Sequence, residues 1–88
     1  MYYLYILQCA DKSLYAGITV DLAKRVNEHN NSKLGAKYTM ARRPVKIVYF
    51  RKFRNRSLAS KAESQIKKLS REEKIKLIKN HAISNSRE

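Results

Sequence analysis

A chain of 88 residues is long enough for one domain with a single modest hydrophobic core. Its only cysteine, Cys9, excludes an internal disulfide and a cysteine-based zinc site, so the composition favours a cytoplasmic protein. The 20 lysines and arginines against 7 acidic residues give a net charge of +13, which is typical of a protein whose partner is a polyanion such as nucleic acid.

Two short apolar segments at the start of the sequence predict a β-hairpin. Residues 2–9 and 13–19 are rich in aromatic and β-branched types, and a polar break separates them. A three-residue loop pairs Tyr5 with Gly17 and gathers the aliphatic side chains on one face, with Tyr5 and Tyr15 on the other. We expect Gly17 to leave open space above the sheet. The first apolar run is interrupted by polar residues and lacks a basic leader, so we predict no signal peptide and no membrane span.

An amphipathic helix is predicted next, over residues 21–30, with Asp21 as its N-cap. Its buried stripe should consist of the apolar residues at helical spacing, Leu22, Ala23 and Val26. Arg25 and His29 are four residues apart, so they should lie side by side along the edge of that stripe. Both could also belong to an ordinary solvated helix edge.

Residues 30–44 lack a clear period and contain Asn, Ser, Gly and Pro, which predicts a long loop before a third strand at residues 45–50. Between Glu28 and Glu63 there is no acidic residue. This stretch instead carries a dense set of cations: Arg42, Arg43, Lys46, Arg51, Lys52, Arg54 and Arg56. Such a set is suited to phosphate contacts, although it could also be a surface kept soluble by charge.

Two more helices complete the predicted order. Ser57 is a suitable cap for the first, whose buried stripe should be Leu58, Ala59, Ala62, Ile66 and Leu69, with Glu63 at its edge. The second should begin at a capping box, Ser70 to Glu73, and end near Lys79. We therefore predict an α+β domain over residues 1–80, a three-stranded, mainly antiparallel sheet flanked by helices in the order β-β-α-β-α-α. Residues 81–88 should form a polar, frayed tail.

Five polar side chains are candidates for chemistry: Tyr5, Tyr15, Arg25, His29 and Glu63. They can converge if the first two helices pack beside the face that carries the tyrosines. Each also has a simpler interpretation, packing for the tyrosines and an i,i+4 ion pair with Lys67 for Glu63. Their convergence is therefore the property that a structure has to test.

The two tyrosines lie within short motifs, Tyr3-Leu4-Tyr5 and, ten residues on, Tyr15-Ala16-Gly17. With the later helical Arg25, His29 and Glu63, the order and spacing resemble the GIY-YIG nuclease superfamily, most of all its small stand-alone members. The resemblance extends to about Lys79. Tyr3 replaces the first glycine of the family pattern, and Leu4 and Ala16 replace isoleucines. Asn80 is a candidate for the asparagine that some members carry late in the domain.

The resemblance implies Mg²⁺-dependent hydrolysis of a phosphodiester, with Mn²⁺ as an alternative metal. Glu63 would hold the cation, and Arg25 would contact the scissile phosphate. Tyr5 would be the general base or its relay, and nearby cations should favour its phenolate. Tyr15 and His29 would form hydrogen bonds around the attacking water and Tyr5.

Within AKYTMARRP, four residues resemble a stretch recurrent in the small family members, and together with Lys46 they are predicted nucleic-acid contacts: Lys37, Tyr38, Arg42 and Arg43. DNA is the expected substrate in preference to RNA, because no aromatic RNA-binding signature is visible. We expect no separate recognition module, so specificity would come from DNA structure, as in repair or recombination, or from a protein partner. The alternative is a module of the same fold that binds nucleic acid without cutting it.

Overall fold

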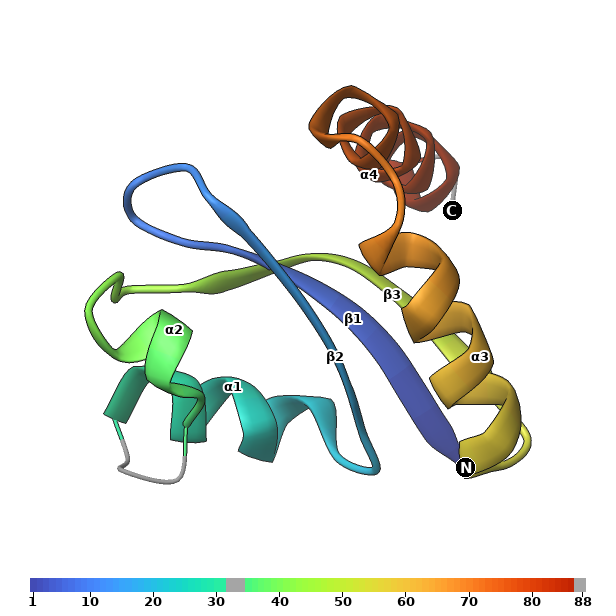
Figure 1. Cartoon of the computed structure of the whole chain (residues 1–88), viewed down its shortest axis with the longest axis horizontal. Coiled ribbons are helices and arrows are strands. Elements are labelled where there is room, and N and C mark those ends of the chain that lie inside the picture. The colour runs from blue at the N-terminus through green and yellow to red at the C-terminus, as the bar shows by residue number, and fades with distance from the viewer. Residues whose placement is uncertain (32–34, 87–88) are drawn as a thin grey trace.

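A three-stranded antiparallel sheet forms the centre of the molecule in a computed structural model that describes residues 1–31 and 35–86, and side chains up to residue 81 (Figure 1). The central strand β1 (Tyr2–Gln8) pairs with β2 (Leu14–Thr19) on one side and β3 (Lys46–Phe53) on the other. Both pairings are antiparallel. The predicted α+β class and element order are confirmed, and β3 runs three residues beyond its predicted end.

The hairpin has the predicted register, in which Tyr5 faces Gly17 and Leu7 faces Tyr15. Its loop is closed by the Cys9 N–H, which donates to the Ser13 carbonyl at 2.9 Å. Lys12, the third loop residue, has a φ of 72°, the left-handed conformation that a three-residue hairpin loop places there. The odd loop length therefore keeps the aliphatic and tyrosine faces separate.

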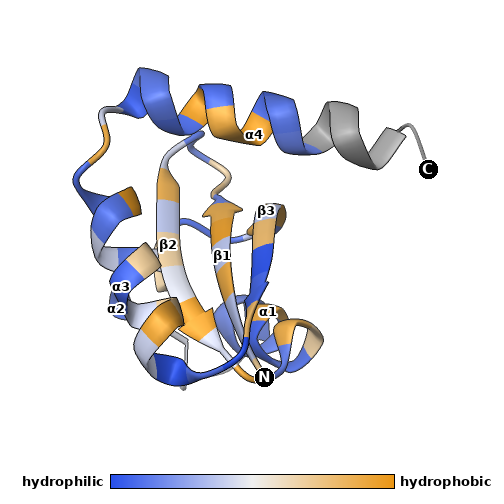
Figure 2. Ribbon diagram, turned by 90° about the vertical axis from the view of Figure 1, so that its right-hand side faces the viewer, coloured by the Kyte–Doolittle hydropathy of each residue, from blue (hydrophilic) through white to orange (hydrophobic). Residues whose placement is uncertain are grey.

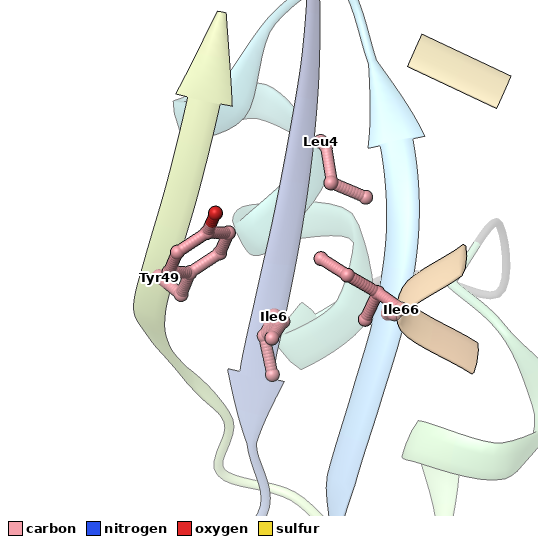
Figure 3. Packing of buried hydrophobic residues seen from close by; sticks show 5 residues of the cluster. Leu4, Ile6, Tyr49 and Ile66 are labelled. Atoms are coloured by element: carbon pink, nitrogen blue, oxygen red, sulfur yellow. The ribbon is translucent and has the colours of Figure 1, made fainter. Parts of the chain in front are cut away.

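Each face of the sheet is covered by different helices, with α1 and α2 on one side and α3 and α4 on the other (Figure 1). The aliphatic face contributes Leu4 and Ile6, which pack with Tyr49 and with Ile66 of α3 (Arg56–Lys67) (Figure 3). The helix α4 (Arg71–Ser86) adds apolar residues to this cluster and lies across the strand ends beside the hairpin loop (Figure 2).

The tyrosine face packs against α1 (Leu22–Asn31). The condition given for convergence, that the first two predicted helices both pack beside this face, is met by α1 and not by α3. The apolar stripe of α3 lacks polar groups that could satisfy buried hydroxyls, and it matches the aliphatic face instead. Glu63 consequently approaches from the other side of the sheet.

The start of α1 is as predicted, because Asp21 Oδ1 accepts from the Lys24 N–H at 3.1 Å. The buried stripe differs from the prediction. Ala23 is exposed, while His29 is completely buried and belongs to the stripe rather than to its edge. A buried imidazole is tolerated here because both of its ring nitrogens find partners, as described below.

The last two helices depart from the prediction at their ends. Asn55, not Ser57, caps α3, since its Oδ1 accepts from the Leu58 N–H at 3.0 Å. Leu58 is 46% exposed in the first turn and does not join the buried stripe. The capping box of α4 is confirmed by reciprocal bonds between Ser70 and Glu73, and the helix continues past Lys79 to Ser86.

The predicted loop at 30–44 contains a one-turn helix, α2 (Lys37–Met40). Residues 32–34 of this loop lie outside the described residues. Among the helices of the described residues, none has the length and apolar character to span a bilayer.

Candidate active site

Tyr5 and His29 meet in the centre of the tyrosine face. The Tyr5 side chain is buried on the middle strand, and its hydroxyl lies 3.0 Å from His29 Nε2. Gly17 faces this phenol across the hairpin, and a Cβ at Gly17 would lie 2.6 Å from the Tyr5 oxygen. The open space expected at Gly17 is thus filled by the Tyr5 ring itself, and only glycine leaves room for it.

The second ring nitrogen of His29 fixes the direction of these hydrogen bonds. His29 Nδ1 lies 2.8 Å from Thr39 Oγ1, and the Thr39 hydroxyl donates to the Ala36 carbonyl at 2.9 Å. Because the single hydroxyl proton of Thr39 is used on Ala36, its oxygen accepts from the Nδ1–H of His29. The Ala36 N–H also points at Nδ1 as a donor and would need Nδ1 to accept, but at 3.4 Å this contact is longer than the 2.8 Å to Thr39, which decides the assignment. We therefore assign an unprotonated Nε2, which accepts from the Tyr5 hydroxyl.

Residues that follow α1 in the chain bring Thr39 to this position. Gly35 passes close to the helix, since a Cβ there would lie 2.7 Å from the Glu28 carbonyl oxygen and 2.8 Å from His29 Cα. A glycine is therefore required for the chain to run back along α1. The one-turn helix α2 then places Thr39 in the core, where it is completely buried.

Two further side chains fasten this segment to α1. Arg43 donates from Nε to the His29 carbonyl and from Nη2 to the Glu28 carbonyl. Asn30 pairs with the backbone of Val45 in both directions, accepting at 2.7 Å and donating at 3.0 Å. Arg43, predicted as a nucleic-acid contact, thus caps the last carbonyls of α1 and holds the wall of the site in place.

Burial sets the protonation states of the central pair. It is the largest cause that raises the pKa of Tyr5 above its ordinary value, and it outweighs the hydrogen bond and charge of Arg25, which lower it. Burial, and then the charge of Arg25, lowers the pKa of His29 to about 4. Both groups are therefore neutral at pH 7. The cation of Arg25 favours the Tyr5 phenolate, as expected, but burial outweighs it and the net pKa is raised.

Arg25 lies beside the pair, nearer to solvent. Its guanidinium donates a hydrogen bond to the Tyr5 oxygen and forms an ion pair with Glu28 at 3.0 Å. About a quarter of its side-chain surface is exposed. Arg25 therefore offers a fixed cation that a ligand can reach, directly next to the buried phenol.

Tyr15 connects His29 to the surface through stacked rings. Its ring lies 5.4 Å from that of His29, edge to face, and 5.8 Å from that of Tyr38 at an interplanar angle of 26°. The Arg42 guanidinium lies over the Tyr38 ring at 4.0 Å, and Arg42 Nε pairs with Asp11 at 3.2 Å. The side chain of Tyr15 thus contacts His29 and Tyr38 through its ring.

Glu63 approaches this group from α3, which packs against both β1 and β2. Its carboxylate lies 3.4 Å from Lys67 Nζ, the i,i+4 pair that was the simpler interpretation. Its charge also contributes to raising the pKa of Tyr5, so the carboxylate acts on the phenol electrostatically. The structure thus brings Tyr5, Tyr15, Arg25 and His29 into one cluster, while Glu63 lies on the helix that covers the other face of the sheet and acts on Tyr5 through its charge.

The donor set is compatible with Mg²⁺. Within the described residues no three side chains of His, Cys, Asp and Glu gather around one point, so an all-protein cage is absent there. Mg²⁺ is commonly held by one or two carboxylates with waters and substrate phosphates. Glu63 supplies one partly exposed carboxylate, which fits this mode.

The remaining predicted contacts are distributed over the surface. Lys37, Tyr38 and Lys46 are exposed, and Tyr38 and Arg42 belong to the stacked rings described above. Asn80 is exposed on α4, a helix that packs against the aliphatic face, so it is not brought to the Tyr5 cluster.

Thr39 is the site residue that sequence reasoning missed. The predicted substrate contacts Lys37 and Tyr38 precede it directly, yet Thr39 is the one that turns inward. The available signal was His29 itself, because a histidine on a buried stripe needs a partner for each ring nitrogen.

Comparisons with known proteins identify relatives of this chain. A family model described as the GIY-YIG catalytic domain matches residues 1–76. A UPF0213 protein of Syntrophus aciditrophicus is 56% identical over 77 residues, 88% of this chain and 88% of the relative. One from Clostridium perfringens is 52% identical over 83 residues, 94% of this chain and 88% of the relative.

Two solution NMR structures are also similar. One, of a protein from E. faecalis, has a TM-score of 0.63 and 42% identity, covering 93% of this chain and 86% of its own. The other, of a UPF0213 protein from Bacillus halodurans, has a TM-score of 0.57 and 40% identity, covering 90% and 84%.

Proposed function

This chain belongs to the GIY-YIG catalytic-domain family, and we propose that it is a divalent-cation-dependent endonuclease that hydrolyses phosphodiester bonds of DNA. The observation that carries the proposal is the directed line of hydrogen bonds from Tyr5 through His29 to Thr39, with Arg25 beside it. A neutral phenol bonded to an unprotonated imidazole nitrogen can pass a proton inward. A packing tyrosine requires no such arrangement.

Tyr5 and His29 act together as the base. The attacking water gives its proton to the Tyr5 oxygen, while the Tyr5 hydroxyl proton moves to His29 Nε2 over the existing 3.0 Å hydrogen bond. The water becomes hydroxide, Tyr5 stays neutral and His29 becomes an imidazolium. Tyr5 therefore does not need to be a phenolate beforehand, which its raised pKa would oppose.

Arg25 contacts the scissile phosphate. Its guanidinium is held by Tyr5 on one side and Glu28 on the other, so its position relative to the base is fixed before the substrate arrives. A fixed cation next to the attacked phosphorus stabilises the charge that develops in the transition state. Tyr15 packs against His29 and keeps the imidazole in place, and its hydroxyl is our candidate for orienting the water.

Glu63 would hold Mg²⁺, with Mn²⁺ as an alternative. The cation, when bound with the substrate phosphate, supplies neutralisation of the leaving oxygen. Lys67, the present partner of Glu63, is exposed and can release the carboxylate at little cost, since such pairs contribute only a few tenths of a kcal/mol. The cations on and around the loop, exposed Lys37 and Lys46 and half-buried Arg42, would contact the DNA backbone, in keeping with the charge of +13.

The test is cleavage of end-labelled single-stranded, duplex, flap and four-way-junction DNA with Mg²⁺, Mn²⁺ or EDTA. We expect metal-dependent products with the wild type and their loss with Tyr5→Phe and Glu63→Ala. Matched controls are Tyr2→Phe, at the start of the same strand, and Glu72→Ala, exposed on α4. Salt-dependent binding without products, unaffected by Glu63→Ala, would overturn the proposal in favour of a non-cutting module. A preference for RNA over matched DNA would overturn the choice of substrate.

A further inference from the structure

We propose that a hollow between the hairpin and α4 binds one unpaired nucleotide of the DNA substrate, a proposal that rests on the proposed function. The hollow measures about 190 Å³ and is lined by Ser13, Leu14, Tyr38, Arg71 and Lys74. It lies at the edge strand β2, beside the start of α4. The bound nucleotide would place its base against Tyr38 and a phosphate against Arg71 and Lys74.

The lining has the composition that a nucleotide requires. The Tyr38 ring and the Leu14 side chain supply an aromatic and an aliphatic surface for a base. Arg71 and Lys74 supply two cations for a phosphate. The volume is below the roughly 300 Å³ of sites that enclose drug-sized ligands, so it suits a single base and not a stacked base pair.

Tyr38 is held by contacts to its ring although the residue is 40% exposed. One contact is the parallel stack with Tyr15, and another is the Arg42 guanidinium over its ring. Arg42 is itself held by Asp11 at 3.2 Å and by the Tyr38 carbonyl at 2.8 Å. A ring that is already ordered loses little conformational entropy when a base packs against the part of it that Tyr15 and Arg42 leave exposed.

The opposite wall is also formed in advance. Arg71 Nη2 donates to the Lys12 carbonyl of the hairpin loop at 2.9 Å, which holds the first turn of α4 against β2. The guanidinium retains further donors for a phosphate. One wall comes from α2 and the other from α4, which lie on opposite sides of the sheet (Figure 1), so the hollow is a product of the tertiary fold.

Tyr15 links the hollow to the catalytic cluster, because its ring contacts both Tyr38 and His29. A nucleotide in the hollow would therefore be a near neighbour, along the same DNA strand, of the phosphate bound at Arg25. A base can enter only if it is unpaired. The preferred substrates are then DNA molecules with an unpaired nucleotide next to the cleaved bond, such as overhangs and flaps, rather than continuous duplex.

Binding can be measured without cleavage by using the full chain with Glu63→Ala and no added metal. Two labelled DNAs with equal numbers of nucleotides are compared by fluorescence anisotropy, a blunt duplex and a duplex with a short single-stranded overhang. We expect the overhang to bind about five-fold more tightly or better, the lower end of what stacking of one base contributes. Adding Tyr38→Leu should remove that preference, whereas Tyr38→Phe should keep it. Equal affinity for both DNAs, or a preference that survives Tyr38→Leu, overturns the proposal.

A second readout does not depend on a folded leucine variant. With 2-aminopurine in the overhang, the Glu63→Ala protein should change the emission of this base, and an unchanged emission overturns the proposal. Lys74→Gln should lower the slope of log Kd against log salt for the overhang DNA by about one. Lys79→Gln, on the same helix but outside the hollow, should leave that slope closer to its original value.

Cleavage by the wild type keeps the two proposals separable. Metal-dependent cleavage combined with a Tyr38-independent preference removes the nucleotide site and leaves the nuclease. A Tyr38-dependent preference without cleavage removes the nuclease and leaves the nucleotide site.

Discussion

Acidification should destabilise this fold through His29 in a defined pH range. The imidazole is completely buried, and burial, followed by the charge of Arg25, lowers its pKa to about 4. In the unfolded chain the pKa returns to its ordinary value of about 6.5. Between these two values the unfolded chain binds a proton that the folded chain does not. The free energy of unfolding must therefore fall as the pH is lowered from about 6.5 to about 4.

The size of the effect follows from the shift in pKa. Each unit corresponds to about 1.4 kcal/mol, so the full shift amounts to about 3 kcal/mol. Most of it, roughly 2 to 3 kcal/mol, should be lost between pH 7.5 and pH 4.5. For a small domain, whose total stability is typically about 5 to 15 kcal/mol, this is a large fraction.

Urea denaturation followed by circular dichroism at several pH values measures this loss. The control is His29→Gln, which keeps a hydrogen-bonding side chain but has no titrating group. This variant should be less stable at pH 7.5 and should show a much smaller loss down to pH 4.5. Asp11 and Glu73, whose lowered pKa values act mainly below this range, are present in both proteins and cancel in the comparison. If wild type and His29→Gln lose equal stability, burial does not hold the imidazole neutral.

Three further predictions test other parts of the structure. Gly17→Ala places a Cβ 2.6 Å from the Tyr5 oxygen. The free energy of unfolding, measured by urea denaturation, should fall by about 1 kcal/mol or more, the usual penalty of overpacking, and most of the cleavage activity should be lost. Cleavage at the wild-type rate would refute the close contact. Thr39→Val removes the acceptor of the Nδ1–H, so the His29 imidazole should populate both neutral tautomers, which ¹⁵N NMR of the ring distinguishes. Thr39→Ser should retain the wild-type spectrum. An unchanged spectrum in the valine variant would contradict the assigned tautomer. Asn55→Ala should lower the stability by about 1 kcal/mol through loss of a helix cap and Ser57→Ala by much less, and the reverse order would restore the cap expected from sequence.

The sheet was predictable because alternation along a strand leaves few choices. An odd loop length, here three residues, keeps the aliphatic and tyrosine faces of the hairpin apart, whereas a two-residue loop would mix them, and the structure has the predicted register. The side on which α3 packs was not predictable in the same way. Its apolar stripe is visible in the sequence, but both faces of β1 are buried, so the choice depends on which face can do without polar partners. The cap at Asn55 rather than Ser57 is a smaller case, since both residue types cap helices well.

The sequence was sufficient to predict which side chains meet at the centre of the candidate site. The spacing of Tyr5, Arg25 and His29 placed them together, and the structure brings them into contact. What the sequence could not provide was the depth of His29. A helical period assigned it to the edge of a stripe, whereas its burial depends on Thr39, a residue ten positions later that reaches it through an irregular segment. Such a pairing has no periodicity by which it could be found.

That burial explains how a tyrosine with a raised pKa can serve as a base in the proposed reaction. Desolvation disfavours both the Tyr5 phenolate and the His29 imidazolium. In the free protein both groups are therefore neutral, and the proton stays on the Tyr5 hydroxyl. A phosphate bound at Arg25 brings negative charge beside both groups. It offsets the cation that, after burial, does most to lower the pKa of His29, and it thereby favours transfer of the Tyr5 proton to Nε2. The Tyr5–His29 pair therefore becomes a stronger base when the substrate is bound. In the free protein the pair is only weakly basic, so solvent does not protonate it at neutral pH.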